Sequence, residues 1–216
     1  MGDRAYRFQQ LPKHSRKRVL KRFLDKDRWS WFEDAIECDL RDFFPERLKE
    51  LGFVVDTRTE RGWNDKRPTI YWSLGCCQGD GMCWEGGFDW DIIIPRFIEK
   101  EQFTQLEWDA IKPRLDNLSA KIRHTDNHYY HYNSCTLDWE DESPDPETAF
   151  LELVESHLVT IMEKLHDLVD EDYKETSSLL EREGYDIIDY HHSEDNCKEE
   201  LANQDKRYSR DGEEAA

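Results

Sequence analysis

A chain of 216 residues with a net charge of −19 has room for one domain of generous size with charged tails. Only 37% of the residues are hydrophobic, but 12% are aromatic, and large rings bury enough area to form a core. No segment approaches the roughly 20 apolar residues of a membrane span, and the start, MGDRAYRFQQ, lacks the apolar region of a signal peptide. We therefore expect a soluble cytoplasmic protein, neither crossing nor bound to a membrane, with reduced cysteines.

Charge is distributed unevenly along the chain. Residues 1–24 carry eight basic residues and one acid, whereas residues 138–216 carry 26 acids and 7 basic residues. So acidic a surface repels nucleic acid and favours a basic protein partner, which leaves direct nucleic-acid binding only to the basic start. A solvated acidic helix and tail is the plainer interpretation.

The first segment, residues 1–26, is predicted to be a basic arm or a short helix. Apolar residues then recur at helical spacing from Trp31 to Leu51. We expect Pro45 to kink or break this helix and Gly52 to cap its end.

Strands are predicted next. They are FVVDTRTERGW from Phe53, PTIYWSLGCC from Pro68 and MCWEGGFDW from Met82. Asp80-Gly81 separates the last two, and Asp-Gly between strand-like runs predicts a hairpin because a type I′ turn needs positive φ at both central residues. The chain is expected to continue extended as far as Pro95.

The second half begins with a predicted helix over 99–118, bent at Pro113. SAKIRH and HYYHYNSCTLDW then form a second predicted hairpin around TDN. After the acidic linker EDESPDPE, apolar residues from Phe150 to Val169 form the stripe of a long amphipathic helix. From His191 onward the chain lacks periodicity, which predicts a disordered tail.

We therefore predict a single-domain α+β fold, with a mostly antiparallel sheet of about four or five strands covered by helices. The core domain spans residues 27–185 and includes the long C-terminal helix. Residues 186–216 form the acidic, disordered tail.

The stretch SLGCCQGDGMCWEGG, residues 73–87, is the candidate site. A turn accounts for Asp80-Gly81, with Gly79 easing the approach to it, but a turn does not need Gln78 or Glu85. The Gly86-Gly87 pair indicates a bulge or a close backbone approach. Two interpretations remain open: a polar pocket lined by Gln78 and Glu85 with Trp72 and Trp84 nearby, or a turn and bulge that serve only the fold.

Metal and nucleotide sites have weaker support. His128 and His131, with Asp80 or Glu85 as an oxygen ligand, are weak candidates for a metal site. The cysteines lack the paired C-x-x-C spacing of zinc sites, although Cys135 can approach the others across the sheet. Phosphate-binding glycine motifs are absent from the sequence. We therefore favour a polar hairpin with buried thiols, and expect no cofactor.

Two segments, TIYWSLGCCQGDGMCWEG and IRHTDNHYYHYNSCTLDW, together resemble a family of small tailed-bacteriophage proteins often labelled "antitoxin of toxin–antitoxin stability system". Cys77 stands where that family has a serine. The resemblance covers about residues 30–180. The matching positions are Gln78, Gly79, Asp80, Gly81, Trp84, Glu85 and Gly86, followed by Tyr129 and His131.

The resemblance implies a phage protein, acting in the cytoplasm of the infected bacterial cell, that binds and neutralises a toxin or defence factor. We expect binding rather than catalysis, with the acidic helix 147–183 contacting a basic surface on the partner. The main alternative is a small-molecule, nucleotide or metal-binding domain, or an enzyme, with its site around the hairpin. An acidic DNA mimic is a minor alternative. The candidate pocket comprises Gln78, Gly79, Asp80, Gly81, Trp84, Glu85, Tyr129 and His131.

Overall fold

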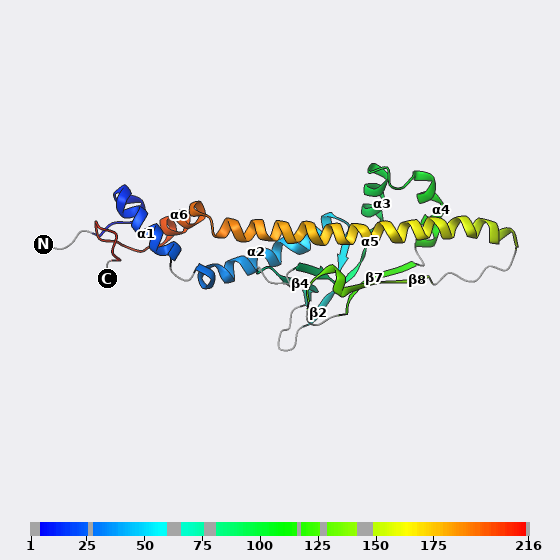
Figure 1. Cartoon of the computed structure of the whole chain (residues 1–216), viewed down its shortest axis with the longest axis horizontal. Helices are drawn as coiled ribbons and strands as arrows, with labels where there is room; N and C mark the ends of the chain where they lie inside the picture. Colours follow the sequence, from blue (N-terminus) through cyan, green and yellow to red (C-terminus); the bar gives the residue numbers. More distant parts are fainter. Residues whose placement is uncertain are drawn as a thin grey trace. The chain divides into compact units, whose positions relative to one another are not determined.

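The structure is a computed structural model of the whole chain (Figure 1), and it describes residues 5–25, 28–59, 66–75, 81–115, 118–125, 129–141 and 149–214. The chain divides into two compact units. The larger unit comprises residues 42–183, and the smaller one comprises residues 1–41 together with 184–216. Among the described residues, no helix is both long enough and apolar enough to cross a membrane.

The larger unit contains a four-stranded antiparallel sheet with the strand order β1-β6-β7-β8. Its strands are Phe53–Val55 (β1), Gly86–Phe88 (β6), Leu118–His124 (β7) and Cys135–Asp141 (β8). Along β7 and β8 the register is continuous, from Leu118 opposite Asp141 to His124 opposite Cys135. Together with the long helix Ala149–His191 (α5), this sheet confirms the predicted α+β class.

Two further strand pairs continue from this sheet: Thr57–Thr59 (β2) with Lys66–Pro68 (β3), and Ile70–Ser73 (β4) with Gly81–Trp84 (β5). Within the described residues the predicted strands are thus present in part: the second ends at Ser73, the third ends at Phe88, and each of the three is interrupted at one residue. These residues are Asp56, Thr69 and Glu85, and their backbones bond to one another. The Asp56 N–H donates to the Glu85 carbonyl at 2.8 Å. The Thr69 N–H donates to the Asp56 carbonyl at 2.7 Å, and the Glu85 N–H donates to the Thr69 carbonyl at 3.0 Å. The three strands consequently bend at one common point.

The helices of the larger unit are the end of Arg28–Glu50 (α2), Trp90–Glu99 (α3), Gln105–Leu115 (α4) and most of α5. Gly52 ends α2 with a φ of +87°, which confirms the predicted cap. The expectation that the chain stays extended as far as Pro95 is wrong, because Pro95 lies inside α3. Asp89 caps this helix by accepting the Asp91 N–H at 3.1 Å.

The predicted strand HYYHYNSCTLDW is only half correct. Strand β8 begins at Cys135, and the residues before it form a short 3-10 helix, Tyr132–Ser134 (η2). His131 caps η2, since its Nδ1 accepts the Asn133 N–H at 3.2 Å. Thr125 bonds through both its N–H and its hydroxyl to the Ser134 carbonyl, which closes the loop. The side chains just before Cys135 therefore do not alternate between two sheet faces.

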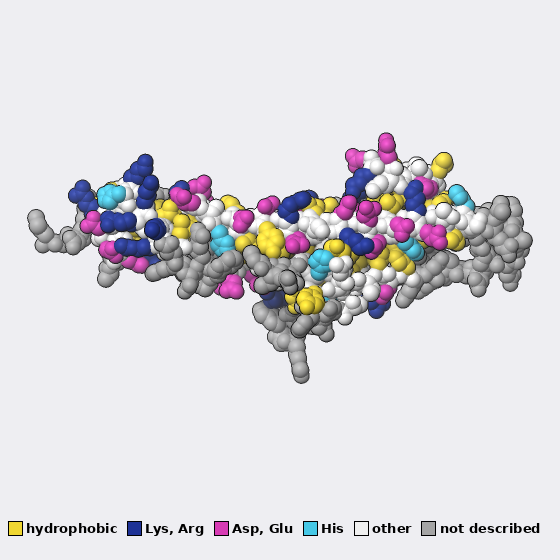
Figure 2. Space-filling model, in the orientation of Figure 1, with side chains coloured by type: hydrophobic (Ala, Val, Ile, Leu, Met, Phe, Trp, Pro, Cys, Tyr) yellow, Lys and Arg dark blue, Asp and Glu magenta, His cyan; other side chains and the backbone are white. Residues whose placement is uncertain are grey.

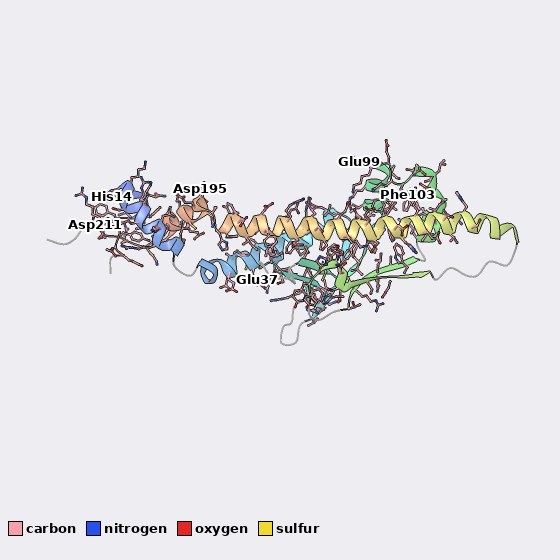
Figure 3. The ribbon with its side chains drawn as sticks, in the orientation of Figure 1. His14, Glu37, Glu99, Phe103, Asp195 and Asp211 are labelled. Carbon is pink, nitrogen blue, oxygen red and sulfur yellow. The ribbon has the colours of Figure 1, made fainter. Side chains whose placement is uncertain are left out.

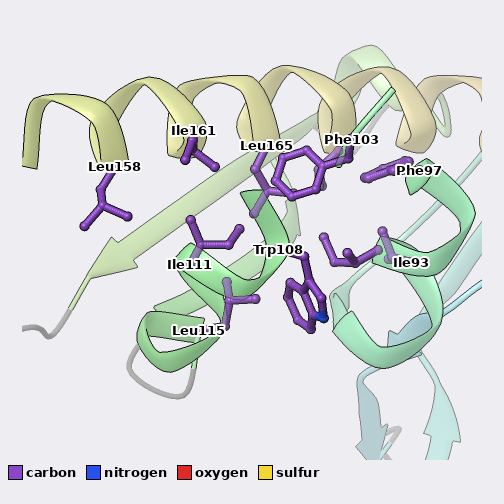
Figure 4. Close-up of a cluster of buried hydrophobic side chains, with 11 residues drawn as sticks. Ile93, Phe97, Phe103, Trp108, Ile111, Leu115, Leu158, Ile161 and Leu165 are labelled. Atoms are coloured by element: carbon purple, nitrogen blue, oxygen red, sulfur yellow. The ribbon is translucent and has the colours of Figure 1, made fainter. Parts of the chain in front are cut away.

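The main core lies where α3, α4 and the first half of α5 meet the sheet (Figure 4). Phe97 and Phe103 are almost completely buried beneath α5, where Phe103 lies beside Leu165. Phe88, Trp90 and Trp139 pack against the same cluster. The apolar stripe predicted for the long helix is confirmed, since four of its members are buried: Leu158, Ile161, Leu165 and Val169.

The smaller unit brings the two ends of the chain together. Its helices include Lys13–Asp25 (α1) and Glu194–Asn203 (α6), and a short 3-10 helix, Phe8–Gln10 (η1), precedes α1. Tyr6 and Tyr208 exchange backbone hydrogen bonds of 2.8 Å in both directions. The prediction of a disordered tail is wrong for the described residues up to 214. Apolar side chains of the tail join those of the start in a common core: Phe8, Leu11, Val19, Leu20, Cys197, Leu201 and Tyr208.

Candidate functional site

The structure describes only some of the predicted site residues. Gln78, Gly79, Asp80 and His128 lie outside the described residues, so what was expected of them remains a prediction. Those described are Gly81, Trp84 and Glu85 on or just after β5, and Tyr129 and His131 between β7 and η2.

Gly81 connects the two halves of the motif. A β-carbon at this position would stand 2.6 Å from the Tyr130 carbonyl oxygen and 3.1 Å from His131 Cδ2. The φ of Gly81 is +154°, a conformation that residues with a side chain rarely adopt. The QGDG segment and the Tyr-x-His segment therefore touch at a glycine whose β-carbon would overlap the neighbouring backbone.

The predicted two-residue turn at Asp80-Gly81 is wrong. Ser73 pairs with Gly81 across β4 and β5, so residues 74–80 form the connection between the strands. Gly81 is the first residue of β5, and its unusual φ serves the contact with Tyr130 rather than a type I′ turn. The Asp-Gly pattern predicts a turn from local conformation alone. Glycine is also required where a distant segment of the chain approaches closely, and that is the reason for Gly81.

Of the two adjacent glycines, only Gly86 is required by its surroundings. Its φ is +154°, and a β-carbon there would overlap the Val54 carbonyl oxygen. At Gly87 a β-carbon would make an ordinary contact, 3.4 Å from the Ala120 carbonyl oxygen. The predicted close backbone approach is thus confirmed at Gly86, where the strands bend.

Trp84 belongs to the core. It is completely buried. Its ring packs edge-on against Phe53 and Tyr173, with ring centroids 4.9 and 4.6 Å away. Its indole therefore contributes to core packing, and the predicted pocket around Gln78 and Glu85 stays a prediction.

Glu85 is held by a chain of hydrogen bonds. The Tyr71 hydroxyl donates to Glu85 Oε1 at 3.0 Å, and Arg58 Nη1 donates to the Tyr71 hydroxyl at 3.0 Å. Burial and the neighbouring carboxylate raise the pKa of Tyr71 to about 12, so its proton stays in place at neutral pH. The Tyr71 ring also stacks on His124 and Tyr130, with centroids 4.5 and 5.6 Å apart. Glu85 thus anchors an aromatic layer that includes the Tyr-x-His segment.

The histidine and tyrosine of the second motif have local structural roles. Tyr129 is exposed, and its carbonyl lies 2.9 Å from His124 Nε2. His131 uses its Nδ1 to cap η2. Within the described part of the chain, no group of three or more His, Cys, Asp or Glu side chains is placed to hold a metal ion. Of the four weak metal candidates, the structure describes only Glu85 and His131.

Sequence reasoning missed a cavity of about 230 Å³ beside β8 and α5. Tyr132, Cys135, Tyr173 and Lys174 are among its lining residues. The predicted approach of Cys135 to another cysteine across the sheet is confirmed for Cys83. Tyr173 comes from α5, and no local pattern in the sequence indicates that it reaches this site.

The two thiols in this region differ in character. Contact with Cys135 and burial raise the pKa of Cys83, whereas the hydrogen bond from Cys83 lowers the pKa of Cys135. Tyr173, whose own pKa is raised by burial, also lowers the pKa of Cys135. Negative charge is therefore better tolerated on Cys135, the more exposed of the two.

The fold defines an α+β domain whose motif residues mainly shape the chain. The chain belongs to the family described as "Domain of unknown function (DUF8835)", whose model matches residues 36–183. That match spans the whole of the larger unit, including every described motif residue. No curated protein and no solved structure matches the chain.

Proposed function

We propose that this protein works by binding, and that it neutralises a bacterial toxin or defence factor with a basic surface, as an antitoxin-like or anti-defence protein of a phage. The resemblance of the QGDG and Tyr-x-His segments supports the phage setting. The described residues Gly81, Trp84 and Gly86 all serve close approach or core packing. The motif residues therefore stabilise the fold, and we propose that the exposed surface of the domain recognises the partner.

The observation that carries this proposal is an acidic ridge on α5, formed by Glu163, Asp167 and Glu171. These residues are four apart, so they share one face of the helix. All three are exposed, and none forms an ion pair with another described residue. Figure 2 shows acidic side chains along this helix.

Other carboxylates on the same helix are paired. Asp172 bonds to Arg96, Glu183 to Arg47 and Asp170 to Lys174. On the ridge, like charges four residues apart repel one another by about 0.2–0.5 kcal/mol per pair. A basic partner would relieve that repulsion, which favours the ridge as a contact surface.

The test begins with capture of a partner from bacterial lysate by the tagged full chain, identified by mass spectrometry. Its affinity is then measured at increasing salt for the wild type and for the triple variant Glu163→Lys, Asp167→Lys, Glu171→Lys. We expect salt to weaken binding, and the ridge variant to lose at least about tenfold in affinity, because both act on exposed charge pairs. Co-expression with the partner tests whether binding neutralises its activity.

A matched control reverses three exposed acids elsewhere in the same unit: Asp42→Lys, Glu46→Lys and Glu99→Lys. Glu99 points outward from α3 (Figure 3). This control should keep wild-type affinity. Salt-independent binding, or an equal loss in both triple variants, would count against the ridge.

A second candidate function, binding of a small polar molecule, is favoured by the 230 Å³ cavity next to Cys135. Asn133, Asp170 and Lys174 bring donors and acceptors to its wall. Native mass spectrometry and thermal shifts with a metabolite set would detect such a ligand, and elemental analysis would detect a metal. If the purified protein retains no molecule or metal and no metabolite shifts its melting, this candidate is eliminated.

A further inference from the structure

A groove of about 650 Å³ lies between α1 and α6 in the smaller unit. Phe8, Leu20 and Ala202 contribute apolar surface to it. Most of the smaller unit falls outside the residues matched by the family model, and so do all the residues that line the groove. The groove is therefore a feature that this chain adds to the family's α+β domain.

Helix α1 has two faces with different roles. Ser15, Arg18 and Arg22 face the C-terminal segment: the Ser15 hydroxyl donates to the Arg210 carbonyl at 2.8 Å, and Arg18 pairs with Asp211 at 3.6 Å. Arg22 makes a two-point contact with Glu213 at 2.9 and 2.5 Å. The acidic end of the chain thus neutralises one side of the basic start.

The other face of α1 forms a wall of the groove. It presents Lys13, Arg16 and Lys17, which share the side of the helix that carries Leu20. In the part of the chain that the structure describes, none of these three cations forms an ion pair. Figure 2 shows basic side chains gathered over α1. The apolar floor is thus rimmed by three exposed cations, and an exposed apolar patch with a polar rim is typical of an interaction site.

The wall on α6 has a different charge. Lys198 is held by Glu194 at 3.1 Å and by Asp195 at 2.9 Å, and Glu199 also lines the groove. An apolar floor between one cationic and one acidic wall does not suit a nucleic acid, whose phosphates would meet Glu194 and Glu199.

We propose that this groove docks an acidic amphipathic helix of a protein partner. The apolar side of such a helix fills the space over Phe8, Leu20 and Ala202, which is the helix-in-groove mode of recognition. Its carboxylates lie along the edge that faces Lys13, Arg16 and Lys17. The groove shares no residue with the acidic ridge and has cations where the ridge has acids, so this inference does not depend on the proposed function.

The test uses fluorescein-labelled peptides of about 15 residues, long enough to form a helix. The first has Leu and Phe at positions i, i+3, i+4 and i+7, with Glu beside them. In the second, Ser replaces the apolar residues, and in the third, Lys replaces Glu. A single-stranded DNA of similar length is the fourth probe. By fluorescence anisotropy with the full chain, the first should bind saturably, and the others at least about tenfold more weakly.

Two variants locate the site. The triple Lys13→Gln, Arg16→Gln, Lys17→Gln should weaken binding of the first peptide by about tenfold or more. Ala202→Leu leaves every charge in place but fills the floor, and should weaken it similarly. The matched control Lys21→Gln, Arg207→Gln, Arg210→Gln removes three cations that do not line the groove, and should bind as the wild type does. Circular dichroism confirms that each variant is folded.

Four results would overturn the proposal. The first is that the acidic amphipathic peptide does not bind saturably. The proposed site recognises apolar contact and charge rather than one sequence, so a helix with both properties should bind. Equal loss in the control triple would indicate unspecific charge attraction. DNA binding that the groove triple removes but Ala202→Leu does not would assign the cations to nucleic acid. A concentration-dependent dimer in sedimentation, broken by the groove triple, would assign the groove to a second copy of the chain.

Discussion

The Tyr130 carbonyl oxygen lies so close to Gly81 that a β-carbon on this glycine would stand only 2.6 Å from it. The contact joins the first residue of β5 to a segment almost fifty positions further along the chain. Because the neighbour is backbone, it cannot rotate away as a side chain would. Two stretches that a sequence reader treats as separate motifs are therefore parts of one packing contact.

Replacing Gly81 by Ala should lower the free energy of unfolding by about 2–3 kcal/mol, because strained φ and steric overlap act together. Urea denaturation of the variant and the wild type measures this. Gly87→Ala is the control, since a β-carbon there meets only an ordinary contact, and we expect it to change stability by less than about 1 kcal/mol. An equal loss of unfolding free energy in both variants would contradict the conclusion that the contact with Tyr130 requires glycine at position 81.

Local signals predicted much of the fold. Gly52 was expected to end a helix, and its φ of +87° with a β-carbon position 2.7 Å from Ile93 Cγ1 shows why glycine is needed. The stripe of the long helix was equally visible, since period and burial coincide over many turns. For DIIIPRF the prediction of an extended segment is wrong. Three β-branched residues before a proline are typical of a strand, but here Ile93, Ile94 and Phe97 are buried on one face of a helix.

The tail was mispredicted for a different reason. Glu213 pairs with Arg22 across more than 190 positions, and Tyr208 is buried against the chain start. A window of a few turns cannot detect such a contact. The sequence does show that the start of the chain is basic and its end acidic. This complementary charge is the signal that could have predicted the contact between them.

The candidate site was predicted only in part. The bend at Gly86 and the approach of Cys135 to a cysteine across the sheet follow from rules about glycine and strand pairing. The complete burial of Trp84 could not be predicted, because a strand pattern does not distinguish a ring at the surface from one in the core. Tyr173 reaches the site from α5, and tertiary contacts of that kind have no local signature.

Arg96 and Asp172 provide a second prediction. Arg96 donates to both Asp172 carboxylate oxygens, at 2.7 and 3.2 Å, and to the Leu51 carbonyl at 2.5 Å. Burial raises the pKa of Asp172 despite the attraction of Arg96. Arg96→Met leaves a buried carboxylate unpaired and should cost about 3 kcal/mol at pH 7. Asp172→Asn alone should cost less, because the neutral side chain has no such desolvation penalty.

The same pair has a defined pH dependence. In Arg96→Met the folded-state pKa of Asp172 rises further above its unfolded value of 3.8, so stability falls as the pH rises through that window. The penalty should therefore be smaller near pH 4 than at pH 7. Adding Asp172→Asn to Arg96→Met should recover at least half of the loss at pH 7, as measured by denaturant titration. A penalty independent of pH, with no recovery in the double variant, would show that the carboxylate is not the cause.

His166 supplies a pH effect of the opposite sign. Its ring stacks on Trp139 with centroids 3.9 Å apart, and burial lowers its pKa from 6.5 although Asp167 and Glu163 oppose the shift. The unfolded chain thus takes up the proton first, and stability is lost as the pH falls below 6.5. His166→Gln should reduce the drop in melting temperature between pH 7.5 and pH 5.5. His14, exposed on α1 (Figure 3), is the control, and His14→Gln should leave the drop unchanged.

Cys135 should be the more reactive of the two paired thiols. The hydrogen bond from Cys83 lowers its pKa, and it lines the cavity beside α5, whereas Cys83 is completely buried with a raised pKa. Since the thiolate is the nucleophile, iodoacetamide near neutral pH should alkylate Cys135 well before Cys83 and the buried Cys197. Peptide mass spectrometry over time measures each rate, and the exposed Cys38 gives the rate for free access.

A variant separates the hydrogen bond from simple exposure. Cys83→Ala removes the donor, so the pKa of Cys135 should rise and its alkylation should slow severalfold at constant pH. Cys197→Ala, in the other unit, removes a buried thiol without touching this pair and should leave the Cys135 rate unchanged. If Cys135 reacts equally fast in both variants, its reactivity comes from access alone. The Cys83 hydrogen bond would then have no part in tuning the cavity wall.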